Sequence, residues 1–207
     1  MMHPNTYVKQ VSKEIGLGVF ASEDIKIGSI IYIQDEFEIV VSPEQFKTMN
    51  RDLQTVIDKY TYTDANGYRI LSWDHGKYVN HCCYPNTIST GYGFEIAIKN
   101  IKKDEQITDD YRLFNLQYEM DLSCCKTNCK KKLRINDFDE NVDKWDQDIK
   151  NALKHFQHTP QPLLAQMNSK DYEELCEYFR NEEAYKSVAG LRQGGVKNAA
   201  QLQALCV

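Results

Sequence analysis

The sequence predicts a mostly β domain of short strands with a helical region appended at its C-terminal end. Short apolar runs separated by turn residues fill the first part of the chain. Later in the chain, apolar residues recur at helical spacing instead. A segment rich in cysteine and lysine lies between the strand-rich part of the chain and the helical part. We therefore expect a compact domain at residues 1–121, a cysteine segment at 122–134 and a helical region at 135–207.

The first part of the chain alternates strand and turn signals. Strands are expected in four β-rich or alternating runs, at residues 18–21, 30–33, 37–41 and 94–98. The Asn66-Gly67 dipeptide lies between Tyr60-Thr61-Tyr62-Thr63 and Tyr68-Arg69-Ile70-Leu71, and it predicts a hairpin. One helix is expected in this part. Ser42 suits its N-cap and Pro43 its first position, and apolar residues recur at helical spacing from there to Tyr60.

The helical region begins after Leu133. An amphipathic helix is predicted by apolar residues three or four positions apart, namely Val142, Trp145, Ile149, Leu153 and Phe156. Ser169 is expected to cap a second helix, and a third helical segment is expected at 184–191. These faces suit packing over the β domain or against a second copy of the chain, as in a homodimer.

Composition excludes several classes of protein. The formal charge of −5 disfavours direct nucleic-acid binding and suits a basic, lysine-rich partner. The N-terminal residues lack a basic and then apolar start, and no run of about 18 apolar residues occurs, so we expect neither a secretory signal nor a membrane span. We expect a soluble protein of the cytoplasm or nucleus, and delivery into another cell stays open. Without export, the 7 cysteines point to reduced thiols or a metal site.

The segment Asn80-His81-Cys82-Cys83-Tyr84-Pro85-Asn86 is the strongest candidate for chemistry. A buried Asn and His together offer donors and acceptors that can hold a polar ligand, and Tyr-Pro-Asn predicts a turn that exposes the preceding backbone. Taken alone, an Asn-His pair is better interpreted as satisfying backbone groups near that turn. Its neighbours in the sequence favour the functional interpretation.

Three motifs occur in a particular order: Gly-Leu-Gly at residues 16–18, Asn-His-Cys-Cys at 80–83 and Thr-Asp-Asp-Tyr at 108–111. Their order and spacing resemble the SET-domain protein-lysine methyltransferases, over about residues 8–133. The resemblance implies a fold of short strands with a pseudoknot that brings the Asn-His strand beside the last Tyr of the third motif. It also implies methyl transfer from S-adenosylmethionine to a lysine side chain of a protein, a histone being one candidate.

The resemblance assigns roles to individual residues. Asn80 would hold the methionine end of the cofactor, the His81 backbone would pair with its adenine, and Gly16, Leu17 and Gly18 would approach it through their backbone. Tyr111 would contact the cofactor and carry the catalysis, because its hydroxyl can accept from the substrate amine and face the transferred methyl.

The substrate channel departs from the family pattern at one position. Tyr60 and Tyr62 are candidates for its lining, although packing is the simpler role for each. Asp109 stands where the family usually has Phe or Tyr, and its acid can bind a water or the substrate ammonium. The family's rule for the degree of methylation therefore does not carry over.

A zinc site is the second expectation from the resemblance. Family members with a related cysteine segment bind zinc through four thiolates, and the matching set here is Cys83, Cys124, Cys125 and Cys129. The spacing is altered, because Leu122 stands where the family has its first Cys and Cys125 is the substitute. The alternative is a group of reduced thiols in a lysine-rich loop.

Two other functions compete with methyl transfer. A SET-like fold that binds a peptide or the cofactor without turnover is the first. A thiol enzyme that uses Cys82 or Cys83 with His81 is the second, and it is disfavoured because neighbours on a strand point to opposite faces.

Overall fold

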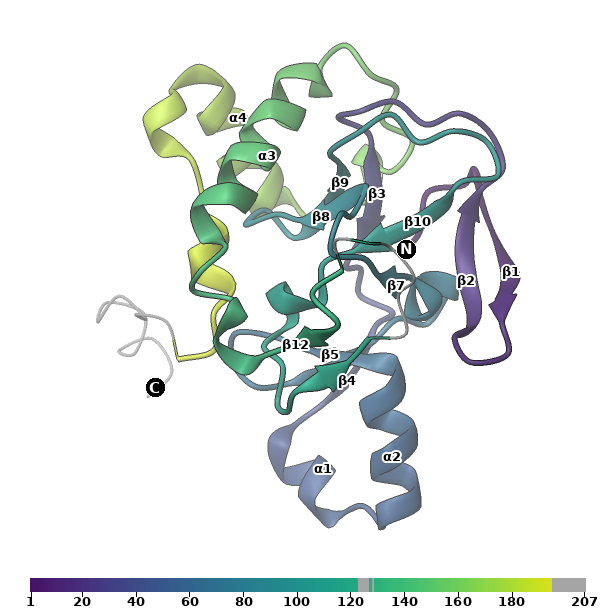
Figure 1. Ribbon diagram of the computed structural model, residues 1–207. Coiled ribbons are helices and arrows are strands. Elements are labelled where there is room, and N and C mark those ends of the chain that lie inside the picture. Colours follow the sequence, from purple (N-terminus) through teal and green to yellow (C-terminus); the bar gives the residue numbers. More distant parts are fainter. Residues whose placement is uncertain (123–126, 128, 195–207) are drawn as a thin grey trace, which may run out of the picture.

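The computed structural model describes residues 1–122, 127 and 129–194, and within these ranges the strands form four small sheets (Figure 1). The strands are β1 (Thr6–Ser12), β2 (Gly16–Ala21), β3 (Ile30–Ile33), β4 (Ile39–Val41), β5 (Thr61–Thr63), β6 (Arg69–Leu71), β7 (Asn80–His81), β8 (Thr87–Ser89), β9 (Phe94–Ala97), β10 (Gln106–Asp109), β11 (Met120–Asp121) and β12 (Lys132–Leu133). The helices are α1 (Pro43–Thr48), α2 (Arg51–Tyr60), α3 (Val142–Phe156) and α4 (Ser169–Arg180). The predicted fold class, mostly short strands followed by helices, is confirmed.

One sheet gathers all three sequence motifs. Its strand order is β1-β2-β10-β7, so the Gly-Leu-Gly strand, the strand before Tyr111 and the Asn-His strand lie in neighbouring positions. β10 runs antiparallel to β2 and parallel to β7. In the parallel pair Thr108 lies opposite Asn80 and Asp109 lies opposite His81. Residues about 30 positions apart in the sequence are thereby brought side by side.

A second sheet has the strand order β3-β9-β8. On its central strand, Phe94 and Ile96 point into the core that α3 and α4 complete. Because side chains alternate along a strand, Glu95 points to the opposite face. Both flanking strands pair with it, Tyr32 of β3 on one side and Ser89 of β8 on the other.

The third sheet carries the predicted hairpin. β5 and β6 pair antiparallel with Tyr62 opposite Ile70, and β4 adds to the other side of β6. Gly67 has a φ of +83°, which glycine adopts readily, so the Asn-Gly turn forms as expected.

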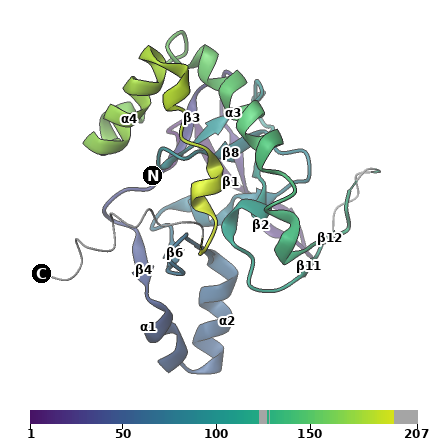
Figure 2. The ribbon, with the colours of Figure 1, turned by 90° about the vertical axis from the view of Figure 1, so that its left-hand side faces the viewer.

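The single helix expected between Pro43 and Tyr60 is wrong. The chain leaves the helix at Met49, which is extended, and α2 begins after Asn50. The Asn50 side chain accepts a hydrogen bond from the Leu53 N–H at 2.9 Å, so an internal cap interrupts the apolar periodicity. The two helices project from the rest of the molecule next to β4 (Figures 1 and 2).

The C-terminal region matches the sequence prediction at α3 and departs from it later. The predicted cap of α4 is wrong by one residue, because Asn168 is the cap and its side chain accepts from the Asp171 N–H at 2.9 Å. The third segment forms two short 3₁₀ turns, Glu182–Ala184 and Val188–Leu191, in place of one helix.

The helices pack over the sheet of the same chain, the first of the two arrangements expected for them. Trp145, Ile149 and Leu153 of α3 are buried in one core with Ile30 and Phe94. Figure 2 shows α3 and α4 lying across the β3 and β8 side of the molecule. In the described part of the chain, no helix has both the length and the apolar character to cross a membrane.

Truncating the α3 face should therefore destabilise the monomer. Leu153 is 2% exposed, so Leu153→Ala should lower the free energy of unfolding by about 2–5 kcal/mol, because it removes methyl groups and leaves a cavity. Urea denaturation measures this change, and light scattering should report the same mass before and after it. Lys154→Ala, exposed on the same helix, is the control. A variant of unchanged stability but altered mass would instead make this face a contact between subunits.

Candidate functional site

The Gly-Leu-Gly strand and the Asn-His strand touch at Asn80. The Asn80 side-chain N–H donates to the Leu17 carbonyl at 2.9 Å. Gly18 has no room for a side chain, since a Cβ there would lie 2.7 Å from the Gln106 amide nitrogen and 2.9 Å from that of Asn80. Glycine at this position therefore permits the close approach of β2 to Asn80.

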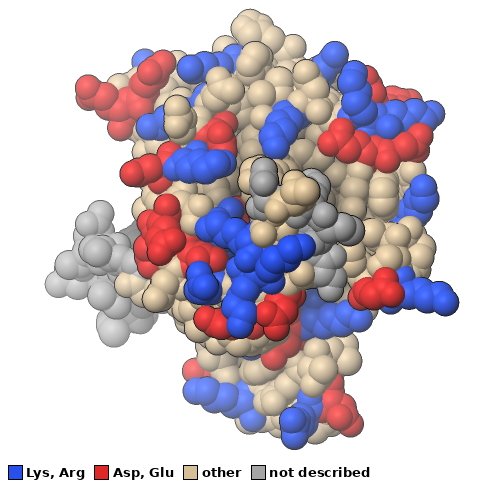
Figure 3. Space-filling model, viewed as in Figure 1, with Lys and Arg blue, Asp and Glu red and all other residues tan. Residues whose placement is uncertain are grey.

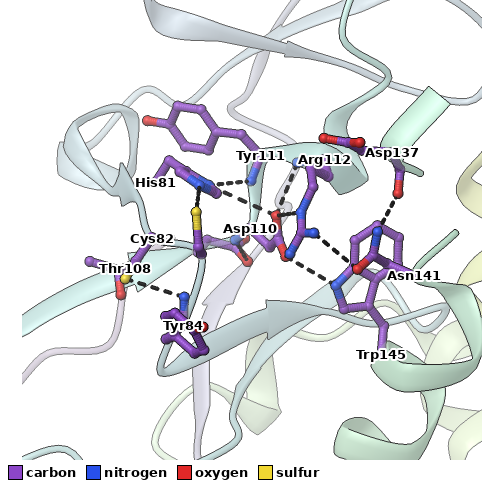
Figure 4. A network of polar contacts seen from close by, with 12 residues as sticks. His81, Cys82, Tyr84, Thr108, Asp110, Tyr111, Arg112, Asp137, Asn141 and Trp145 are labelled. Carbon is purple, nitrogen blue, oxygen red and sulfur yellow. Dashed lines mark hydrogen bonds and ion pairs between the residues drawn. The ribbon is translucent and has the colours of Figure 1, made fainter. Parts of the chain in front are cut away.

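Tyr111 opens a 3₁₀ turn one residue after β10, and two hydrogen bonds join it to Val79 and His81, of which Figure 4 shows the one to His81. Its backbone N–H donates to His81 Nδ1 at 3.2 Å, and its hydroxyl donates to the Val79 carbonyl at 2.7 Å. The rings of His81 and Tyr111 lie 5.5 Å apart, centroid to centroid. The juxtaposition that the resemblance implied is therefore present.

His81 is held in one neutral form. Because Nδ1 accepts from the Tyr111 N–H, the ring proton belongs on Nε2, which lies 3.4 Å from Cys83 Sγ. Burial lowers the pKa of His81 to about 4, against the weaker opposing effect of Asp110. Burial likewise raises the pKa of the Cys83 thiol. The two residues lie close together, but a neutral donor beside a protonated thiol is a poor nucleophilic pair.

A cavity of about 510 Å³ opens beside Tyr111. The predicted channel residues Tyr60, Tyr62 and Asp109 line it together with Tyr111. Its other lining residues include Tyr32, Val79, Glu95, Phe114 and Met120. Gly16, Leu17, Gly18, Asn80 and His81 are not among them, so the expected cofactor residues lie beyond Val79 and Tyr111.

Residues 133–138 and Trp145 do not belong to the lining of this cavity. The helical region reaches the motif residues at Asp110 instead. Trp145 Nε1 donates to Asp110 Oδ2 at 3.1 Å, and the Arg112 guanidinium binds the same carboxylate while it donates to Asn141 Oδ1 at 2.9 Å (Figure 4).

The cavity contains a buried carboxyl pair that the sequence did not reveal as a pair. Asp109 is fully buried, and burial raises the pKa of its carboxyl, as does the nearby charge of Glu95. Burial also raises the pKa of Glu95, to about 7. Asp109 was a candidate from its position in the motif. The only sequence signal for Glu95 was an acid inside an alternating strand, which ordinarily faces solvent.

The zinc ligands are only partly described. Cys83 Sγ and Cys129 Sγ lie 3.9 Å apart. Two thiolates of a tetrahedral zinc lie about 3.8 Å apart, given a Zn–S distance of about 2.3 Å, so this pair fits a shared metal. Cys124 and Cys125 lie outside the described residues. Among the residues that are described, no three potential ligands gather. The four-cysteine site stays a prediction.

The surface offers charges of both signs. In Figure 3 basic side chains gather in the middle of the face shown, with acidic side chains around them. The predicted contrast between an acidic protein and a basic partner therefore does not appear on this face as a single acidic patch.

Comparison with known proteins adds the family. Residues 16–112 match the model of the SET domain. They contain the Gly-Leu-Gly, Asn-His and Asp-Tyr motifs described above. Residues 16–112 are a SET domain.

The curated relatives are named as histone-lysine N-methyltransferases. The chain is 26% identical over 135 residues to the putative histone-lysine N-methyltransferase ASHH4 of Arabidopsis thaliana, a match that covers 59% of this chain and 38% of the relative. It is 23% identical over 137 residues to the histone-lysine N-methyltransferase ASHH3 of the same plant, covering 60% and 37%. The chain thus spans less than two fifths of the length of these relatives.

Solved structures also match. The crystal structure of the Plasmodium falciparum putative histone methyltransferase PFL0690c is 27% identical, with 53% of this chain and 95% of that chain covered and a TM-score of 0.39. The structure of KRYPTONITE in complex with mCHH DNA, H3(1-15) peptide and SAH is 19% identical, covers 64% and 30%, and has a TM-score of 0.44.

The buried neutral His81 should make this site sensitive to acid. An unfolded histidine titrates near its ordinary pKa of 6.5 and the folded one at about 4, so between these pH values the unfolded state binds the extra proton. Stability should therefore fall as the pH is lowered through this window, by up to about 3 kcal/mol from His81 alone.

The His81→Asn variant isolates the contribution of His81 to the pH dependence of stability. Its side-chain oxygen can accept from the Tyr111 N–H, but it has no ring that titrates. Unfolding free energies measured by denaturant at pH 7 and pH 4.5 should differ less in His81→Asn than in the wild type. His155→Asn, exposed on α3, is the control and should behave as the wild type does. Equal acid sensitivity in all three proteins would contradict the buried neutral form.

Proposed function

We propose that this SET domain transfers methyl groups from S-adenosylmethionine to a lysine side chain of a protein substrate. One observation carries the proposal. Tyr111 lies between the strand expected to hold the cofactor and a cavity large enough for a lysine side chain. A residue in this position can face both reactants at once, and such alignment is the main requirement of a methyl transfer.

The residues that would hold the cofactor are Gly16, Leu17, Gly18, Asn80 and His81. Leu17 is 38% exposed and Asn80 and His81 are half-buried, so a ligand can reach this edge of the sheet. Asn80 is already oriented by the Leu17 carbonyl, and its side-chain oxygen is an acceptor suited to a cationic amino group. Bound S-adenosylmethionine supplies a methyl group made electrophilic by its positively charged sulfur.

Tyr111 would act as a neutral phenol. Burial raises the pKa of its hydroxyl, and the charges of Asp109 and Glu95 act in the same direction. The hydroxyl donates its proton to the Val79 carbonyl, so its lone pairs are directed elsewhere. They can accept from a substrate amine and favour a methyl group that carries partial positive charge.

The names of the relatives make a histone the first substrate to test. The zinc set Cys83, Cys124, Cys125 and Cys129 belongs to the same proposal. A metal there would join the segment at 122–134 to the strand that precedes Tyr84, and would supply a structural crosslink rather than chemistry. The competing function is a SET-like module that binds without turnover. The acid at position 109, where the family has an aromatic ring, is the observation that favours it.

The Gly18→Ala variant tests the cofactor residues. The added methyl group would displace the side chains of Val11, Gln106 and Asn80 but no backbone atom, so the fold should survive and affinity for S-adenosylmethionine should fall tenfold or more. Calorimetric titration measures the affinity. Gly190→Ala is the control, since a Cβ there meets nothing within 4 Å. Undiminished binding by the Gly18 variant would place the cofactor elsewhere.

The Tyr111→Phe variant tests turnover. Transfer of a labelled methyl from S-adenosylmethionine to mixed basic proteins, followed by mass spectrometry of the labelled residue, should identify lysine. The variant should bind the cofactor as the wild type does and lose about 10²-fold or more in rate, because one positioned hydroxyl is gone.

Tyr118→Phe, half-exposed at the rim of the cavity, is the matched control and should keep its rate. Cofactor binding by the wild type with no transfer to any protein would favour the binding module. A wild-type rate in Tyr111→Phe would remove that residue from the mechanism.

A further inference from the structure

Two acids from different strands meet at the cavity. Glu95 lies on the central strand β9, between Tyr32 and Ser89, on the face away from the core. Asp109 ends β10, and its Oδ2 lies at the limit of hydrogen bonding from Ser89 Oγ, at 3.5 Å. Both acids line the cavity that Tyr111 also lines.

The surroundings of the pair are acidic or neutral. The groups that act electrostatically on the two carboxyls or face them from neighbouring elements are Asp110, Tyr111, Tyr62, Ser89, Tyr32 and the amino terminus. The only cation in this set, the amino terminus, lies 3.1 Å from Asp35 and 3.8 Å from Glu38.

The basic side chains of the cavity are also engaged with other groups. Arg69 Nη2 pairs with Asp58 at 2.5 Å, although its buried Nε has no acceptor among the described residues, and Lys77 donates to the Asp74 carbonyl at 2.6 Å. Lys59 lies over the Tyr60 ring. The negative charge of the pair is therefore left for a ligand.

One oxygen of the pair also requires a donor. Glu95 Oε2 is buried, and no described N–H or O–H donates to it. Buried polar atoms are nearly always hydrogen-bonded, so the donor to this oxygen is either a carboxyl proton that Glu95 shares with Asp109 or a group that enters the cavity. Burial raises the pKa of both carboxyls and so favours a pair that shares one proton and carries one negative charge.

We propose that Glu95 and Asp109 together bind the ammonium group of the substrate lysine inside this cavity and accept its proton. The proposal rests on the proposed function and names how that site recognises its substrate. A primary ammonium has three donors and one positive charge, which match the free oxygen and the single negative charge of the pair. The pair thus selects a cationic amine over a neutral side chain of the same length.

The proton step balances within the pair. An N–H bond of the ammonium breaks, its electrons stay on nitrogen, and an O–H bond forms at the carboxylate. An ion pair becomes a neutral amine and a neutral acid, and a site shielded from water favours that change. The amine keeps a free lone pair beside the Tyr111 hydroxyl, and the proton leaves the pair to solvent after the product departs.

The test uses the full chain and a small probe, n-butylammonium, with n-butanol as its uncharged counterpart. ¹³C NMR of the carboxyl carbons follows Glu95 and Asp109 directly. In the wild type the two resonances should titrate together, above the usual range for carboxyls. Saturating n-butylammonium should shift both, and n-butanol should shift neither.

Glu95→Gln and Asp109→Asn preserve shape, and each should weaken n-butylammonium binding tenfold or more without changing the affinity for S-adenosylmethionine. Glu173→Gln, exposed on α4, is the control for a lost charge elsewhere. Two carboxyls that titrate independently in the usual range, or unchanged probe binding in both variants, would overturn the proposal. If either variant fails to fold, the wild-type titration and the comparison of the two probes still show whether the pair binds a cationic amine.

The same proteins separate this inference from the proposed function. If the wild type binds n-butylammonium at the pair but transfers no methyl group, the cation site stands and the methyltransferase assignment falls. If lysine is methylated, the KM for the labelled substrate should rise and kcat should fall in Glu95→Gln. Methylation with wild-type KM and kcat in that variant would reject the role of the pair alone.

Discussion

The buried carboxylate of Asp110 is the interaction on which the arrangement of this site depends. It is 1% exposed, and a buried charge is stable only with close partners. The Arg112 guanidinium binds both of its oxygens, and the Trp145 indole donates to one of them. These contacts join the end of β10 to α3. The backbone that carries Asp109 and Tyr111 is consequently held by the helical region, although residues 135–194 of that region contribute nothing to the cavity lining.

Two adjacent acids acquire different roles from this arrangement. Successive residues at a strand end point to opposite sides, so Asp110 points toward α3 while Asp109 points into the cavity. Asp110 meets a guanidinium and an indole N–H. Asp109 meets Glu95 and Ser89, and burial shifts its pKa toward the protonated form. When two neighbouring carboxyls lie in different environments, one is commonly charged and the other protonated. Here the two carboxyls belong to consecutive residues.

The sequence predicted the parts of the structure that depend on local pattern or on the motif order. The α3 helix, the Asn66-Gly67 hairpin, and the contact of His81 with Tyr111 all follow from such patterns. The failures have a common cause. The break at Met49 and the cap at Asn168 result from side-chain hydrogen bonds that compete with apolar periodicity. Glu95 was missed because alternation tells which residues face away from a core but not whether a second cavity lies on that other face.

The burial of Asp109 and of Glu95 in one cavity is explained only when the two acids are considered as a pair. A lone carboxylate at either position would lie in a cavity whose described cations are engaged elsewhere, and burial would penalise its charge. When both acids are present, the two carboxyls can share one proton, and the remaining negative charge is spread over both groups. Replacing the usual aromatic ring by Asp109 therefore requires a partner on the neighbouring sheet, and β9 supplies it at Glu95, which pairs with Tyr32 of β3 and with Ser89 of β8. The proposed amine site accounts for the departure from the family motif, because it gives both acids a role, whereas loss of turnover alone leaves the second acid unexplained.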